Sequence, residues 1–210
     1  MEEFKQSPSL DNESKQDILE WTDYIKDYSG QDKIKSYAHI LYQISYNLEK
    51  NNNQELLIKA VEASVSTGLQ SLKTANSIGE IAEILGHYLV KPVMVHTLRN
   101  EELKHRSYTQ KVAELVAYYY EIGNDPVQKQ KPILIYQRLS EMYPEKYREK
   151  YEYLLAKIDE KSDMVSEPDE TIANNFMNYV KETLDSLSND PIMSIDPEAV
   201  FQEFVELAKK

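Results

Sequence analysis

The sequence has no cysteine and little glycine, and both shortages narrow the chemistry open to it. Without cysteine, the chain of 210 residues can form no disulfide, no thiolate metal site and no cysteine nucleophile. Five scattered glycines cannot build the glycine-rich loop that cradles phosphates in nucleotide-binding proteins. No uninterrupted apolar run approaches the ~20 residues that a membrane-spanning helix needs, and so we expect no membrane insertion.

The remaining composition is that of a folded protein in an aqueous compartment. Hydrophobic residues make up 41% of the chain and charged residues 29%, and the length suits one large or two small domains. The first fifteen residues are acidic and polar, unlike a signal peptide or a mitochondrial transit peptide. We therefore expect a cytoplasmic protein.

The net charge of −12 belongs entirely to the two end segments. Residues 1–30 hold eight acids and three lysines, residues 161–210 hold eleven acids and four lysines, and residues 31–160 hold seventeen residues of each sign. Tyrosine is the sole aromatic residue type of the middle, whereas all phenylalanine and tryptophan lies in the end segments. We expect a helical body over 1–160, with an acidic N-terminal helix (1–30) and neutral tyrosine-rich hairpins (31–160). A linker over 161–169 and an acidic helical pair over 170–210 should follow.

Apolar residues recur three and four positions apart along nearly the whole chain, which is typical of amphipathic helices. The segment Ser77-Ile-Gly-Glu80 is a capping box that predicts a helix start, and Pro92 is expected to end that helix. A long helical stretch follows, with Asn100 as the candidate break. We find no alternating strand pattern with hairpin turns. The sequence therefore predicts an all-α fold of about ten helices in antiparallel hairpins, for which an α-solenoid is one candidate arrangement.

Residues 113–160 resemble one tetratricopeptide repeat. A helix that ends at the turn Gly123-Asn-Asp-Pro126 is followed by a second helix, in which Tyr136, Leu139 and Pro144 occupy that repeat's aromatic, small-or-apolar and proline positions. Leu139 replaces the usual alanine, and no second copy follows at the ~34-residue period of the family. The resemblance implies a repeat-like helical hairpin and assigns the chain to no family.

Two groups of tyrosines and the last helix supply candidate partner-binding residues. The first group is three consecutive tyrosines, at least one of which should face away from the core, and the second recurs every four residues along one helix. Tyrosine is favoured at interfaces because it combines contact area with a polar tip. The alternative is that each group packs inside its own helices. The candidates are Tyr118, Tyr119, Tyr120, Tyr143, Tyr147, Tyr151, Phe201 and Phe204.

Basic residues gather around the second tyrosine group, within residues 129–157. Stacking of bases on tyrosine, with lysine and arginine neutralising phosphates, is how single strands are often held. The candidate contacts are Lys129, Lys131, Arg138, Lys146, Arg148 and Lys150. Glutamates interleaved with these bases can pair with them on the same helix, which favours an ordinary salt-bridged surface. The net charge also opposes strong binding of nucleic acid by the whole chain.

Catalytic motifs are scarce. Glu102-Leu-Lys-His105 places a carboxylate and an imidazole on one helix face, the spacing that builds di-iron sites when paired copies are present, but it occurs once. The four histidines are scattered and accompany no nucleophile elbow. We therefore expect no catalytic residue, no metal and no cofactor.

The leading prediction is a non-enzymatic protein–protein interaction module, such as an adaptor, a regulator or an assembly subunit. It would bind another protein, or a second copy of itself, through its tyrosine-rich and acidic helical surfaces. The first alternative is an all-helical accessory subunit that contacts single-stranded nucleic acid through residues 129–157. The second alternative is an enzyme with an unrecognised Glu/His metal site.

Overall fold

The computed structural model describes residues 9–51, 53–123, 130–157 and 170–210, and every regular element within those ranges is helical. The prediction of an all-α fold is therefore confirmed. The chain divides into two compact units, one made of Met1–Ser71 with Pro191–Lys210 and the other of Leu72–Asp190. The predicted linker over 161–169 lies outside the described residues and stays a prediction.

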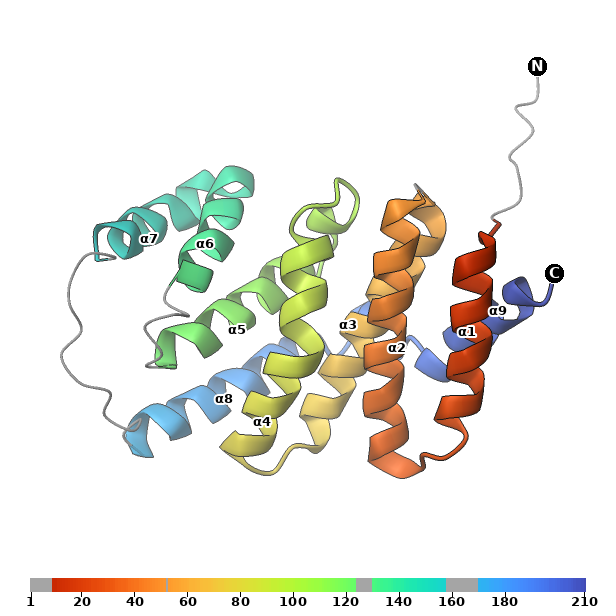
Figure 1. Ribbon diagram of the computed structural model, residues 1–210. Coiled ribbons are helices and arrows are strands. Elements are labelled where there is room, and N and C mark those ends of the chain that lie inside the picture. The colour runs from red at the N-terminus through yellow and green to blue at the C-terminus, as the bar shows by residue number, and fades with distance from the viewer. Residues whose placement is uncertain (1–8, 52, 124–129, 158–169) are drawn as a thin grey trace, which may run out of the picture. The chain divides into compact units, whose positions relative to one another are not determined.

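The first unit joins segments from the two ends of the sequence. It contains α1 (Asn12–Ile25), α2 (Gly30–Lys50) and α3 (Gln54–Thr74) up to Ser71. The short 3₁₀ segment η5 (Pro191–Ser194) and α9 (Pro197–Ala208) complete it, and α9 packs against α1 and α2 (Figure 1). The last helix is thus part of the core that the first helices begin.

Apolar burial and polar contacts both hold α9 in the first unit. Phe201 is fully buried and its ring lies 5.6 Å from the ring of Tyr37 on α2, centroid to centroid. Lys33 on α2 forms an ion pair with Glu198 at 2.9 Å. The sequence groups residues 170–210 as one acidic pair of helices, whereas the structure assigns its two helices to different units.

After the last residues of α3, the second unit continues with a helix that includes two π-helical segments. Its α-helical part is α4 (Ile78–Ile84), and Ser77 caps it by accepting a hydrogen bond from the backbone N–H of Glu80 at 3.2 Å. This confirms the predicted helix start. The π-helical segments η1 (Leu85–Leu89) and η2 (Pro92–Thr97) follow along the same helix.

Pro92 does not end this helix, and that prediction was wrong. Around the proline the backbone hydrogen bonds span five residues, from the N–H of Val90 to the carbonyl of Leu85 and from the N–H of Leu98 to the carbonyl of Val93. In a regular α-helix a proline ring clashes with the carbonyl four residues earlier. The wider π-type turns relieve this clash, and such turns frequently occur at functional sites.

The rest of the second unit is arranged around α5 (Thr109–Ile122). This helix packs against α6 (Gln130–Met142), against α8 (Glu170–Ser186) and against η2. Its apolar face is fully buried, which accounts for its central place. The next helix, α7 (Pro144–Ala156), forms a hairpin with α6 and packs against it (Figure 1).

Candidate functional site

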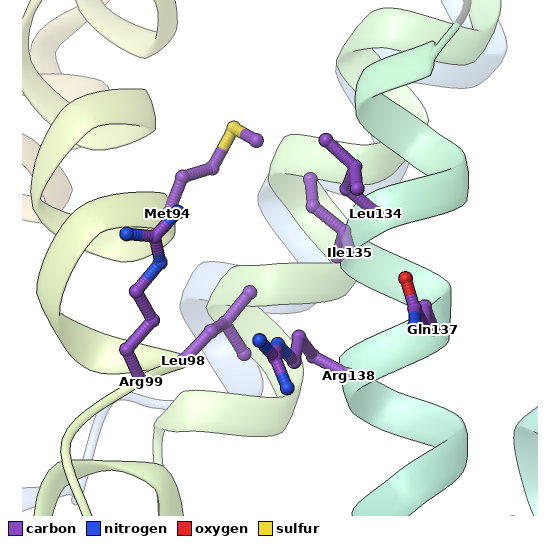
Figure 2. Close-up of a pocket in the computed structure, with 7 residues that line it drawn as sticks. All are labelled: Met94, Leu98, Arg99, Leu134, Ile135, Gln137 and Arg138. Atoms are coloured by element: carbon purple, nitrogen blue, oxygen red, sulfur yellow. The ribbon is translucent and has the colours of Figure 1, made fainter.

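A small pocket lies between η2 and α6 in the second unit. Its cavity volume is about 90 Å³, and Figure 2 shows lining side chains from the end of the π-helical segment on one side and from α6 on the other. The lining residues are Met94, Leu98, Arg99, Leu134, Ile135, Gln137 and Arg138. None of the seven carries a carboxylate or an aromatic ring. The pocket therefore combines an apolar surface with positive charge.

The apolar part of the pocket runs from a buried floor to an exposed rim. Leu98 and Ile135 are buried, with 5% and 1% of their surface exposed, and they form the floor. Met94 is half-buried, and Leu134 is 51% exposed on the surface of α6. A solvent-exposed leucine beside a buried apolar floor is a surface that a partner's apolar side chain can cover.

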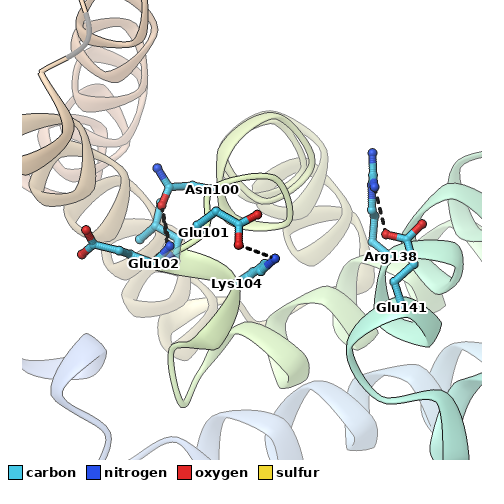
Figure 3. A network of polar contacts seen from close by, with 7 residues as sticks. Asn100, Glu101, Glu102, Lys104, Arg138 and Glu141 are labelled. Carbon is cyan, nitrogen blue, oxygen red and sulfur yellow. Dashed lines mark hydrogen bonds and ion pairs between the residues drawn. The ribbon is translucent and has the colours of Figure 1, made fainter.

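The two arginines reach the pocket from different elements. Arg99 directly follows the residue that closes η2, and the chain turns there because the Asn100 side chain accepts a hydrogen bond from the backbone N–H of Glu102 at 3.0 Å. The predicted break near Asn100 is therefore confirmed. Arg138 lies on α6 and pairs with Glu141 on the same helix at 2.9 Å (Figure 3).

A nearby carboxylate is already engaged by a lysine. Glu101 pairs with Lys104 at 2.7 Å, as Figure 3 shows, and the hydrogen bond from that lysine lowers the pKa of the Glu101 carboxyl. The ion pair therefore favours the ionised form of Glu101.

Tyr147, the middle member of the second tyrosine group, contacts α5. Tyr147 is buried and its hydroxyl donates a hydrogen bond to the carboxylate of Glu114 on α5. The Nζ atom of Lys146 lies 3.0 Å from the same carboxylate, and Lys150 pairs with Glu121 at 2.6 Å. These contacts attach α7 to α5. Tyr147 thus contributes to helix packing, whereas Tyr143 and Tyr151 are half-buried.

The three consecutive tyrosines are also engaged within the second unit. Tyr118 meets the ring of Phe176 edge-on at 5.4 Å, centroid to centroid, and the ring of Tyr179 at 5.0 Å. Tyr120 is buried and accepts a hydrogen bond from Lys131 at 3.0 Å. Tyr119 is half-buried. The group therefore connects α5 to α8 and to α6.

The other predicted contact residues are scattered. Phe201 and Phe204 lie in the core of the first unit, and Tyr143 and Tyr151 are half-buried on α7. Among the basic candidates, Lys129 lies outside the described residues and Arg148 is exposed. The remaining basic candidates are engaged as described above, Lys131, Lys146 and Lys150 with partners on α5 and Arg138 with Glu141.

The tyrosines packed against α5 predict a loss of stability in alkali. Burial raises the pKa of Tyr179 to about 12, and it also raises the pKa of Tyr136 and Tyr147, with the negative charges of Glu121 and Glu114 adding to the effect. A raised pKa in the folded state stabilises the fold fully below the unfolded value of about 10, and this stabilisation is lost as the pH rises through the folded value. We expect the free energy of unfolding, measured with urea, to fall between pH about 10 and about 12.

A matched variant separates this effect from the loss of lysine charge over the same range. Tyr147→Phe removes one titrating hydroxyl and leaves the lysines in place. The decline in stability with pH should therefore be shallower in this variant. Identical slopes in the variant and the parent chain would contradict the assignment to tyrosine.

Part of the pocket was visible in the sequence. Residues 133–135 are three consecutive apolar residues on one helix, and so one of them must lie off the core-facing stripe. Leu134 is that residue. The sequence carries no comparable sign of Arg99 or Met94, because their role depends on which helix lies opposite them.

Glu102 and His105, whose spacing in the sequence matches one half of a di-iron motif, belong to no metal-ligating cluster among the described residues. Glu102 and His105 are both exposed, and His105 lies on a single 3₁₀ turn, η3 (Leu103–His105), rather than on an α-helix face. Over the described ranges no group of three or more metal-ligating side chains is found, and no helix there is long and apolar enough to cross a membrane. No protein-family model matches the chain, and searches of curated proteins and of solved structures find no significant match.

Proposed function

We propose that this protein is a non-enzymatic interaction module and that the pocket between η2 and α6 receives an apolar side chain of its partner. The observation that carries the proposal is the exposed Leu134 beside the buried floor formed by Leu98 and Ile135. Interfaces are dominated by a few apolar or aromatic anchors that fill pockets of this kind. The π-helical segment next to the pocket supports the same location.

The size of the pocket favours a single side chain over a metabolite. Its volume is about 90 Å³, whereas pockets that bury a small-molecule ligand measure roughly 300–1,000 Å³. A cavity this small holds about one leucine or methionine side chain.

A peptide selection tests this proposal without knowledge of the partner. The full-length chain is immobilised and used to select from a phage-displayed library of random peptides. We expect enriched peptides whose affinity falls by at least about tenfold in the variant Leu134→Asp, because an anchor in a pocket contributes about 2 kcal/mol or more. Fluorescence polarisation of the synthesised peptides gives the affinities.

Leu155→Asp is the matched control, because Leu155 is 45% exposed on α7 of the same unit and does not line the pocket. This variant should bind the selected peptides as the parent chain does. If no peptide is enriched, or if the two variants weaken binding equally, the pocket is not a binding site and the proposal fails.

A further inference from the structure

We infer that the segment bound in this pocket is acidic, with carboxylates on both sides of its apolar anchor. The inference rests on the proposed function and adds the chemistry of the partner. It follows from the charges around the pocket, from the state of the nearby acids and from the absence of rings in the lining.

Two guanidinium groups lie at the pocket, one from each side. Arg99 follows η2 and Arg138 belongs to α6, so an anchor placed between the two elements has a positive charge on each side. Among the described residues, no ion pair or side-chain hydrogen bond engages Arg99. Arginine presents a planar fork of donors that matches a carboxylate with two parallel hydrogen bonds. Carboxylates flanking the anchor would complement both groups.

The existing partner of Arg138 can be exchanged. Its ion pair with Glu141 joins two side chains that are about half exposed, at 51% and 49%. Exposed pairs of this kind contribute little to stability because water screens them. A partner's carboxylate can therefore take the place of Glu141 at small cost.

A second nearby acid, Glu101, is paired with a lysine and not with Arg99. Glu101 follows Arg99 in the sequence but binds Lys104 instead (Figure 3). The lining itself holds two cations and no carboxylate, and Glu141, which pairs with Arg138, lies outside it. A negatively charged ligand complements such a lining.

The lining also decides between an acidic peptide and nucleic acid. Both are anionic, but single strands are held by bases stacked on aromatic side chains. No aromatic ring lines this pocket, and its floor consists of Leu98 and Ile135. An aliphatic floor fits an apolar side chain, and the arginines fit the carboxylates beside it.

The experiment compares two synthetic probes of opposite charge on the full-length chain. The acidic probe is a fluorescein-labelled peptide with one leucine flanked on each side by two glutamates, and the basic probe carries lysines in their place. We expect the acidic probe to bind in fluorescence polarisation and the basic probe to bind at least about tenfold more weakly. Raising the salt concentration should weaken binding of the acidic probe.

Charge-reversal variants test which arginines attract the acidic probe. Arg99→Glu and Arg138→Glu should each weaken binding of the acidic probe by about tenfold, and the double variant should prefer the basic probe. Arg148→Glu is the matched control, because Arg148 is exposed on α7, does not line the pocket and changes the net charge equally. Its affinity for the acidic probe should stay within about twofold of the parent value.

Each contrary outcome is distinct. If peptides selected at Leu134 are neutral or basic, or if the two probes bind equally, the inference is wrong while the proposed function stands. If Arg148→Glu weakens binding as much as Arg99→Glu does, the attraction belongs to the whole surface and the inference is also wrong. Self-association of the chain that the same two reversals abolish would assign the pocket to a second copy instead. If neither the probes nor any selected peptide binds at the pocket, the proposed function fails as well.

Discussion

Replacing Phe201 with alanine should lower the free energy of unfolding by about 3–5 kcal/mol, the usual cost of removing a buried aromatic side chain. Phe201 has no exposed surface and packs on the ring of Tyr37. The loss includes the cavity that remains, because α9 is held from two sides by α1 and α2 and cannot collapse fully onto the gap. With typical domain stabilities of roughly 5–15 kcal/mol, this one change removes a large share of the total.

The sequence provides a local probe for this measurement. Trp21 is the single tryptophan and lies on α1 in the same unit as Phe201, so its fluorescence during urea unfolding reports on that unit. Gln202→Ala, an exposed change on the same helix, is the matched control and should shift the midpoint little. Phe201→Leu keeps a measurable folded state if the alanine variant does not fold. Equal midpoints for Phe201→Ala and Gln202→Ala would show that α9 does not pack as described.

The second large effect is expected at Phe176, where alanine should also cost about 3–5 kcal/mol. Phe176 is fully buried on α8, and its ring meets that of Tyr118 on α5 edge-on at 87° between the ring planes. Pairs of this geometry contribute about 0.5–1.5 kcal/mol beyond the buried area. The change therefore removes both the apolar contact and the ring contact between α8 and α5.

Two signals should accompany that loss. The midpoint of urea unfolding, followed by far-ultraviolet circular dichroism, should fall, and the near-ultraviolet signal of the tyrosines should weaken as Tyr118 loses its fixed neighbour. Asn178→Ala, exposed on the same helix, should leave both unchanged. A Phe176→Ala variant with the control's midpoint would contradict the packing of α8 on α5.

Local periodicity was sufficient to predict the helices. On α8, Phe176, Val180 and Leu184 recur every four residues and all three are buried, so the spacing alone gives both the helix and its inward face. Pro92 was misjudged because the sequence shows the proline but not the change to five-residue hydrogen bonding around it. A shift of this kind depends on how the neighbouring turns pack.

Which helix covers which face could not be predicted from local pattern. The apolar stripe of α9 would fit α8 as well as α1 and α2. Periodicity identifies which face of a helix is apolar, but it does not identify the helix that packs against that face. The same limit applies to the pocket, where Arg99 and Arg138 are 39 positions apart in the sequence and meet only because η2 and α6 lie on either side of the cavity. The sequence shows that Tyr147 and Glu114 are present, but it does not show that their side chains form a hydrogen bond in the folded protein.

The first unit combines segments from the two ends of the chain, and this affects how it folds during synthesis on the ribosome. Its first three helices emerge early, but α9 follows only after the roughly 120 residues of the second unit have been made. Because protein synthesis proceeds at about 5–20 residues per second, the apolar faces of α1 and α2 stay exposed for on the order of ten seconds before α9 is available to pack on them. During that interval the nascent chain presents an incomplete core to solvent, and a chaperone that shields it would raise the yield of folded protein.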